Sequence, residues 1–479
     1  MSEYRHLYSL IEDVFDLNGI RTLCMELKFE TGVDITFENL AGDTIRRKAQ
    51  ELQEYARRNG ITPELLQVIH SLKPRIDLTK FGGPEPDLSK PDRPINNEAA
   101  SGGGVKEAKE PEPPKTVYDN FDIVIRSTDK EFEYWLEAKS PMGDTVDPIR
   151  QKFPFEDDNY QYLRKLLADV RLAEPKNAEE MGELLRKFLF PAQIQSKFRE
   201  SLSVVKRDGK EGLRVRLNIP RGKTELYQVP WEYVRDDKAF LALNDNTPLV
   251  RYLPTDKEPV PISAPTPIKI LLAWANPEDL PELKVDGEIN AIKEALKSLT
   301  KSGKVIIDEL PNVTPMDLFS KVASNPPHIF HFIGHGVMDS ENGAAIALND
   351  GENKHALMDA GILQEIFQEE ATKLIIFSAC QTGSMGDKSS DSNSSYAFMG
   401  LAPRLVWGGI PAVIAMQFDL PNKAAKPFVE PLYKFLASGK PLDWAISKAR
   451  LSLRVAGLRN AYWGIPVLFM RSPDGNIWV

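Results

Sequence analysis

Two apolar runs in this chain of 479 residues each end in a turn of small residues that carries one reactive side chain. The first run ends in the segment 334–336, which carries His335, and the second ends in the segment 378–380, which carries Cys380. A free cysteine has a pKa of about 8.5 and is mostly protonated at neutral pH, so it needs a base to become a nucleophile. An imidazole, with a pKa of about 6.5, can take that proton and pass it to a leaving amine. The pair predicts a cysteine peptidase.

The order and spacing of the two residues support this prediction. His335 precedes Cys380 by 380 − 335 = 45 residues, and a caspase-type base lies about 50 residues before its cysteine. The backbone N–H groups of Gly336 and Cys380 are the candidate donors for the oxyanion that such a reaction forms. Each residue alone also fits a structural role, a histidine in a turn or a small buried thiol. Taken together, they favour catalysis.

Two alternative chemistries have weaker support. His331 lies four residues before His335, but the segment lacks the HExxH pattern and is strand-like, so a buried histidine is expected there and no metal site. Gly222-Lys223-Thr224 resembles the end of a phosphate loop, but no glycine lies five residues before Gly222. No cofactor is expected.

The composition restricts the class of protein. The net charge is −9 and the pI is about 5.5, which argues against nucleic-acid binding. No stretch of about 18 apolar residues predicts a membrane span, and the first residues lack a signal-peptide core. Only Cys24 and Cys380 are cysteines, which excludes a disulfide framework and fits a reducing cytoplasm. We therefore expect a cytoplasmic protein.

Residues 266–479 alternate between strand and helix patterns, as in a parallel α/β sheet. Strands are predicted at 268–275, 305–307, 410–418 and 463–470 and in the apolar runs that lead to His335 and Cys380, and helices at 289–299, 316–323, 356–369, 424–437 and 441–455. Ligand sites of such sheets lie beyond the carboxyl ends of the strands. Both His335 and Cys380 follow directly after a predicted strand, so both are placed at that edge.

Three further regions precede this one. Residues 1–76 read as a small helical bundle with Cys24 in its core, and residues 77–116 form a Pro/Gly-rich, charged tract that predicts a flexible linker. Residues 117–260 mix strands, at 132–138 and 213–219, with a helical stretch at 158–205.

The polar segment 386–395 directly follows the proposed nucleophile. It is interpreted either as a solvated loop or as an active-site loop that becomes ordered on activation.

Several sequence motifs resemble those of the CHAT family of caspase-like proteases (clan CD). These motifs are 270–279, 331–336 (HFIGHG), 377–383 (FSACQTG), 415–418 (AMQF), 439–445 and 463–469, and, with a weaker resemblance, 230–233 (PWEY) and 240–243. His335 and Cys380 match the catalytic dyad of the family. Asp419 and Asn422 depart from it, since proline and an acidic residue are common there. The resemblance implies a caspase-like fold with a parallel or mixed sheet.

The first 75 residues resemble the death-like effector-associated domains of prokaryotic effectors, through the segments 23–27, 39–42 and 57–60. This resemblance implies recruitment of a partner that carries a matching domain. It also implies a role in prokaryotic immune or stress signalling, including antiviral defence, with a protein substrate for which a gasdermin-like protein is one candidate.

Four residues near the expected strand ends are candidates for the S1 pocket: Glu278, Asp279, Ser378 and Asp419. Acidic side chains there would favour arginine or lysine at P1, because a buried cation needs a paired charge.

The sequence thus predicts an α/β, caspase-like protein preceded by a mixed α/β subdomain and a helical bundle. Two functions remain open: an endopeptidase cutting a protein substrate on activation, and a non-cleaving scaffold or adaptor in a signalling complex. The intact pair of His335 and Cys380 favours the endopeptidase.

Overall fold

The computed structural model describes a defined part of the chain. This part comprises residues 7–15, 20, 23–24, 27, 35, 40, 44–73, 78–81, 84–85, 118–145, 147–169, 173–237, 239–255, 267–339, 343–367, 371–378, 393–456 and 460–478. It divides into two compact units, Met1–Glu110 and Pro111–Val479.

The first unit is a helical bundle, as predicted. Its described helices are α1 (Leu7–Val14), α3 (Ile45–Arg58), α4 (Thr62–Leu72) and the short 3₁₀ helix η2 (Thr79–Phe81). The side chain of Thr44 accepts a hydrogen bond from the N–H of Arg47 and so caps α3. Cys24 is buried in the core of the bundle. Leu78 also lies in this core, and the predicted boundary at residue 76 stays a prediction.

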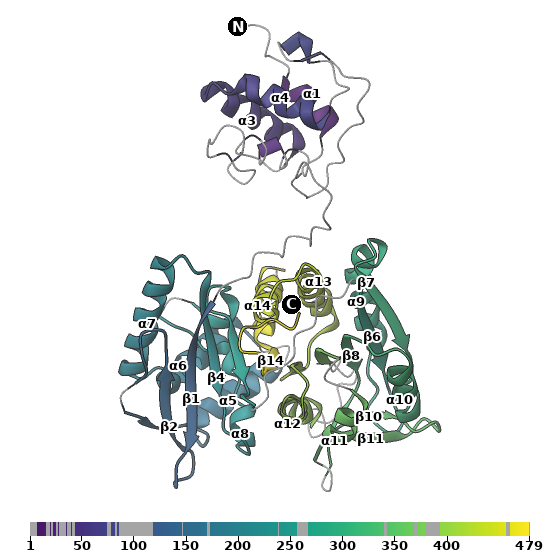
Figure 1. Cartoon of the computed structure of the whole chain (residues 1–479). Helices are drawn as coiled ribbons and strands as arrows, with labels where there is room; N and C mark the ends of the chain where they lie inside the picture. The colour runs from purple at the N-terminus through teal and green to yellow at the C-terminus, as the bar shows by residue number, and fades with distance from the viewer. Residues whose placement is uncertain are drawn as a thin grey trace. The chain divides into compact units, whose positions relative to one another are not determined.

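The second unit is built on one sheet of eleven strands (Figure 1). The strands are β1 (Tyr118–Ser127), β2 (Glu133–Lys139), β3 (Ile149–Lys152), β4 (Gly212–Asn218), β5 (Leu249–Tyr252), β6 (Ile268–Trp274), β7 (Val305–Leu310), β8 (Ile329–Ile333), β12 (Leu374–Ser378), β13 (Ala412–Met416) and β14 (Pro466–Met470). Their order is β3-β2-β1-β4-β5-β14-β13-β12-β8-β6-β7. The neighbouring strands β6, β8, β12 and β13 are mutually parallel, whereas β14 runs antiparallel to β13, so the sheet is mixed.

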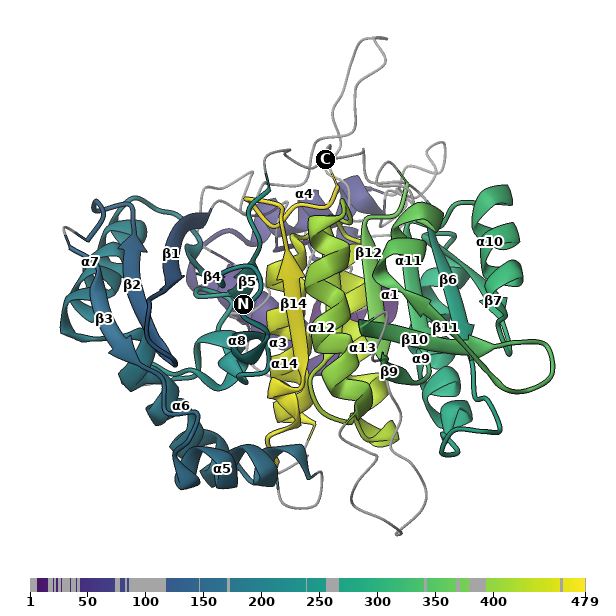
Figure 2. The same ribbon diagram turned by 90° about the horizontal axis from the view of Figure 1, so that it is seen from below.

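Helices cover both faces of this sheet. They are α5 (Asp158–Ala168), α6 (Pro175–Leu189), α7 (Ala192–Arg207), α8 (Thr224–Tyr227), α9 (Val285–Lys301), α10 (Pro315–Ser324), α11 (Ala360–Ile366), α12 (Asn393–Trp407), α13 (Asn422–Leu436) and α14 (Leu442–Val455). Figures 1 and 2 show α12 on one face of the central strands and α13 and α14 on the other. The central strands are buried throughout, which explains why they read as continuous apolar runs.

A second, three-stranded antiparallel sheet was not predicted. It consists of β9 (Gly336–Asp339), β10 (Gly343–Asn349) and β11 (His355–Asp359), in the order β11-β10-β9. The predicted helix at 356–369 is therefore wrong over its first residues, which pair with β10, and α11 begins only at Ala360. Asp359 ends the strand and starts the helix, because its side chain accepts a hydrogen bond from the N–H of Ile362 at 3.0 Å.

A buried network of charged groups joins the N-terminal and C-terminal strands of the sheet. Arg251 on β5 pairs with Glu232 in the 3₁₀ helix η3 (Trp231–Tyr233) at 2.6 Å, and both side chains are almost completely buried. Gln417, just beyond β13, donates to Glu232 at 3.0 Å and to the carbonyl of Gly464 at 2.6 Å. Arg450 on α14 lies 3.9 Å from Glu232, and burial lowers the pKa of Arg450 to about 10, against the opposing effect of Glu232.

This network brings into contact residues from sequence motifs that are far apart along the chain. Glu232 belongs to PWEY, Gln417 to AMQF, and Gly464 to the segment before β14. A second buried pair, Arg214 on β4 with Asp443 on α14, joins the same two halves. Residues 117–260 and 266–479 therefore share one sheet, and the predicted boundary between them stays a prediction.

Within the described part of the chain, no helix has both the length and the apolar character needed to cross a bilayer.

Candidate active site

The carboxyl ends of β6, β8 and β12 are held together by backbone hydrogen bonds. The N–H of Ala275 donates to the carbonyl of Ile333 at 3.2 Å, and the N–H of Gly334 donates to the carbonyl of Ser378 at 3.1 Å. The turn that carries His335 is therefore bonded directly to the last residue of β12, two residues before Cys380. This edge is where the sequence placed the candidate site.

His335 is buried, with 6% of its surface exposed, and its ring is held by the main chain of another loop. Nε2 lies 2.7 Å from the carbonyl oxygen of Pro281. Because a carbonyl only accepts, Nε2 must carry the hydrogen and donate it. In the neutral ring the acceptor is then Nδ1. The contact therefore fixes the tautomer and makes Nδ1 the atom that can take a proton.

The loop that presents Pro281 has its own internal support. Asn276 closes it, because its Oδ1 accepts from the N–H of Leu283 at 3.0 Å and its Nδ2 donates to the carbonyl of Leu283 at 3.4 Å. Leu283 is buried. Sequence reasoning missed both Pro281 and Asn276, because a backbone carbonyl leaves no signal in the residue type.

The N–H of Gly336 is directed away from its own sheet. The N–H of Ala347 donates to the carbonyl of His335 at 2.9 Å, and Gly336 stands opposite Ile346 in the register of β9 and β10. This pattern makes Gly336 and Ile346 a non-hydrogen-bonded pair. The N–H of Gly336 therefore points out of the β9–β10 ladder, as an oxyanion donor would require.

Cys380 and most of the predicted polar segment, residues 386–392, lie outside the described residues. The described chain stops at Ser378 and resumes at Asn393, the first residue of α12. The predicted polar segment therefore overlaps this helix only at 393–395. The roles of Cys380 as nucleophile and oxyanion donor stay predictions.

Ser378 has a buried acidic partner that sequence reasoning missed. Its hydroxyl donates to a carboxylate oxygen of Glu288, which lies in the first turn of α9 and is 3% exposed. A glutamate at that place in the sequence looks like an ordinary favourable charge near a helix N-terminus. Glu288 is instead buried, and its hydrogen bond with Ser378 locates its carboxylate at the end of β12.

The other three S1 candidates divide into two groups. Glu278 accepts from Asn353 at 3.1 Å, and Asp279 pairs with His355 at 2.8 Å, so both carboxylates hold the connection between β10 and β11. Desolvation raises the pKa of Asp279, but the hydrogen bonds and charge of His355 outweigh it and leave that pKa below its ordinary value. Asp419 is half-buried, three residues beyond the end of β13, the strand next to β12.

His331 is a buried residue of β8, as predicted. Its Nδ1 lies 3.0 Å from the hydroxyl of Tyr433 on α13, and burial lowers its pKa to about 3. Its Nε2 has no hydrogen-bond partner among the described residues. The ring is therefore neutral at physiological pH and supports the strand that leads to His335.

The neutral state of His331 predicts a dependence of stability on pH. In the unfolded chain a histidine titrates near 6.5, so between about pH 6.5 and 3 the unfolded state binds the extra proton. Above about pH 6.5 this histidine does not reduce the free energy of unfolding. As the pH falls from about 6.5 toward 3, the free energy of unfolding decreases, because only the unfolded chain binds the proton. Between pH 7 and 5 this group should cost about 2 kcal/mol of the free energy of unfolding.

Urea unfolding at pH 7 and pH 5 measures this effect. His331→Phe should reduce the difference between the two pH values by about that amount, whereas Tyr433→Phe, which leaves the imidazole in place, should retain it. An equal pH dependence in the wild type and in His331→Phe would show that His331 does not titrate as described.

Two family models match the chain. Residues 179–471 match the model of the CHAT domain, and residues 6–74 match the model of effector-associated domain 7. None of the curated proteins is significantly similar to the chain.

Among solved structures, the chain is similar to a chain of the Saccharomyces cerevisiae separase–securin complex, with a TM-score of 0.41 and 11% identity over 98% of this chain and 37% of that chain. A second structure of that complex gives a TM-score of 0.30 and 13% identity over 95% of this chain and 28% of that chain. The chain thus spans 37% and 28% of the lengths of these two chains.

Proposed function

Because this chain belongs to the CHAT-domain family of caspase-like proteases, we propose that it is a cysteine endopeptidase in which Cys380 is the nucleophile and His335 the base. The observation that carries the proposal is the hydrogen bond from Nε2 of His335 to the carbonyl of Pro281. It leaves Nδ1 to exchange protons, at a strand end bonded to Ser378, two residues before Cys380.

In the proposed reaction, each residue has one role. Nδ1 of His335 takes the thiol proton as the sulfur of Cys380 attacks the scissile carbonyl, and the N–H groups of Gly336 and Cys380 receive the oxyanion. His335 then gives the proton to the leaving amine, and an acyl-enzyme remains. Water, deprotonated by the same imidazole, hydrolyses this thioester and restores the thiol.

The remaining parts of the proposal concern recognition. The effector-associated domain recruits a partner that carries a matching domain, in prokaryotic immune or stress signalling in the cytoplasm. The substrate is a protein, with a gasdermin-like protein as one candidate. Of the S1 candidates, Glu278 and Asp279 bind the connection between β10 and β11. Ser378 is fully buried and donates to Glu288, so Asp419, half-buried beyond β13, is the acidic candidate that we retain.

The experiment is an incubation of the purified protein with the proteins encoded beside it, wild type against Cys380→Ala. We expect the wild type to cut one of them and Cys380→Ala to cut none, because the variant has no nucleophile at this position. The residue before each new N-terminus identifies the P1 preference, and arginine or lysine there would support an acidic S1 pocket. Cleavage that persists in Cys380→Ala would favour the alternative, a scaffold without activity of its own.

A further inference from the structure

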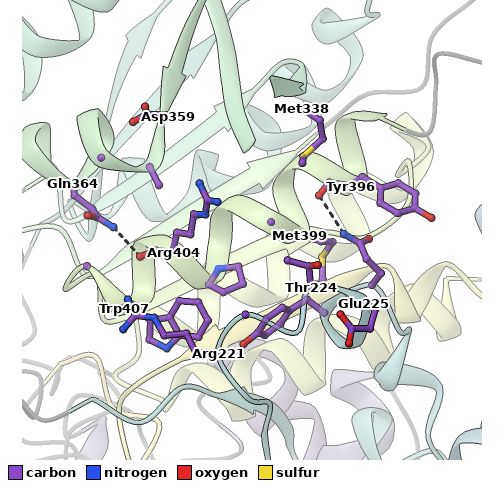
Figure 3. A pocket seen from close by; sticks show the side chains of 18 residues that line it. Arg221, Thr224, Glu225, Met338, Asp359, Gln364, Tyr396, Met399, Arg404 and Trp407 are labelled. Atoms are coloured by element: carbon purple, nitrogen blue, oxygen red, sulfur yellow. Dashed lines mark hydrogen bonds between the residues drawn. The ribbon is translucent and has the colours of Figure 1, made fainter. Parts of the chain in front are cut away.

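A cavity of about 860 Å³ opens between α8 and α12, bounded by β9 and by the start of α11 (Figure 3). Its volume lies in the range of pockets that bind ligands. The residues that line it include neither His335, Gly336 and Pro281 nor any of the S1 candidates. It is therefore a site distinct from the one described above.

The apolar part of the cavity suits a large side chain. Met338, Met399 and Trp407 contribute to its lining, and Met338 is 52% exposed. Tyr227 supports the indole of Trp407 edge-on, with 5.9 Å between the ring centroids. Methionine is flexible and adapts to apolar groups of different shapes. The indole and the two methionines thus give the lining apolar surface, part of it adaptable, for one apolar anchor.

The charged part of the cavity favours an anion. Arg221 and Arg404 are both exposed at its rim, and Arg221 lies over the indole of Trp407 at 4.9 Å. No carboxylate of the described residues forms an ion pair with Arg221. In Figure 3 the side chain of Arg404 rises between those of Gln364 and Met338. Guanidinium groups are suited to bind carboxylates through paired hydrogen bonds.

The two acidic residues of the lining are engaged elsewhere. Glu225 accepts from the hydroxyl of Tyr134 at 3.0 Å and pairs with Lys223 at 3.7 Å. Asp359 caps the N-terminus of α11. Among the charged residues of the lining, Arg221 therefore favours an anionic ligand.

Two walls of the cavity belong to elements that follow the proposed dyad residues along the chain. β9 starts with the residue after His335, and Met338 on this strand lines the cavity. α12 is the first described element after Cys380 along the chain, and its residues Tyr396 and Met399 also line the cavity. α12 also packs against β9. Phe398 on α12 also stacks on Phe377 of β12, three residues before Cys380, with 5.3 Å between the ring centroids. A ligand that shifts α12 would therefore act on the end of β12 that precedes Cys380.

We infer that this cavity is a regulatory docking site for a segment of a partner protein in which a large apolar side chain stands beside a carboxylate. Its effect on activity rests on the proposed function, but binding of the segment does not.

The binding test uses the full-length Cys380→Ala variant and a matched series of N-acetylated tetrapeptide amides. The peptides carry leucine, phenylalanine or tryptophan next to glutamate, glutamine or lysine, and calorimetry measures their affinities. The glutamate peptides should bind best. Arg221→Gln and Arg404→Gln should each weaken them by about tenfold, whereas Arg199→Gln, an exposed arginine outside the cavity, should not. Absence of binding, or equal binding of glutamate and lysine peptides, would overturn the inference.

The regulatory test measures how fast iodoacetamide alkylates Cys380 in the wild type, with mass spectrometry to separate this thiol from the buried Cys24. A saturating glutamate peptide should change this rate by about fivefold or more, and Arg404→Gln should require more peptide for the same change. A selective peptide that leaves the rate unchanged would overturn the regulatory role. Because the binding test uses a variant without the nucleophile, its result is independent of whether the chain cuts proteins.

Discussion

Replacing His335 by alanine is expected to lower the turnover of a protein substrate by about 10²–10⁴-fold. The wild-type ring is buried and is oriented by the carbonyl of Pro281, so it is prepared for proton transfer at Nδ1. Without it, no base takes the proton of the Cys380 thiol and no acid protonates the leaving amine. The loss should appear in the rate of cleavage and not in the affinity for the substrate, because His335 acts on the reacting atoms.

The same substitution at His328 provides the control. His328 stands just before β8, at the opposite end of the strand, and its Nδ1 accepts from the N–H of Lys269 at 2.9 Å. His328→Ala should leave turnover close to that of the wild type. Equal turnover in His335→Ala and the wild type would exclude His335 as the base.

The second large effect is expected in the buried network between β5 and β14. Glu232→Gln keeps the shape of the side chain but leaves the buried guanidinium groups of Arg251 and Arg450 without a carboxylate. Breaking a buried ion pair in this way costs about 3–5 kcal/mol, because an uncompensated charge stays in the interior. Hydrogen exchange of the amides in β5 and β14 measures the loss, since their protection reports the opening of the sheet at this junction.

A surface pair offers a matched control for this substitution. Glu137 on β2 receives two hydrogen bonds from Arg126, at 3.0 and 3.2 Å, but the arginine is 57% exposed. Exposed pairs of this kind contribute about 0–1 kcal/mol, so Glu137→Gln should have a small effect. Similar losses in the two variants would mean that the buried network does not hold the two halves of the sheet together.

The sequence predicted the secondary structure best where buried residues recur in a regular apolar pattern. The apolar runs before His335 and Cys380 correctly predicted β8 and β12, because central strands of a parallel region are buried on both faces. The helical spacing of residues 289–299 likewise located α9. From these elements and the parallel topology, the position of His335 at the carboxyl edge followed.

The hydrophobic pattern gave a wrong prediction where pairing with a neighbouring strand determines the secondary structure. Residues 356–359 have enough apolar character for a helix, but their pairing with β10 makes them a strand. Short antiparallel strands such as β9 carry little periodicity, because a few residues cannot establish alternation.

The site details depended on tertiary contacts that residue types do not encode. The carbonyl of Pro281 and the buried carboxylate of Glu288 reach the strand ends from loops and helices distant in sequence. Conversely, Glu278 and Asp279 had the right charge and approximate place for an S1 pocket, but they bind Asn353 and His355. The sequence therefore identified acidic residues near the strand ends, but it did not show which residues their carboxylates bind.

The central claim is that Cys380, activated by His335, cuts a protein. Sequencing of the new N-termini that appear when the purified protein meets the proteins encoded beside it tests this claim most directly. We expect defined new N-termini with the wild type and none with Cys380→Ala or, over the same time, with His335→Ala. The same N-termini with Cys380→Ala, or none with the wild type in the presence of its recruited partner, would contradict it.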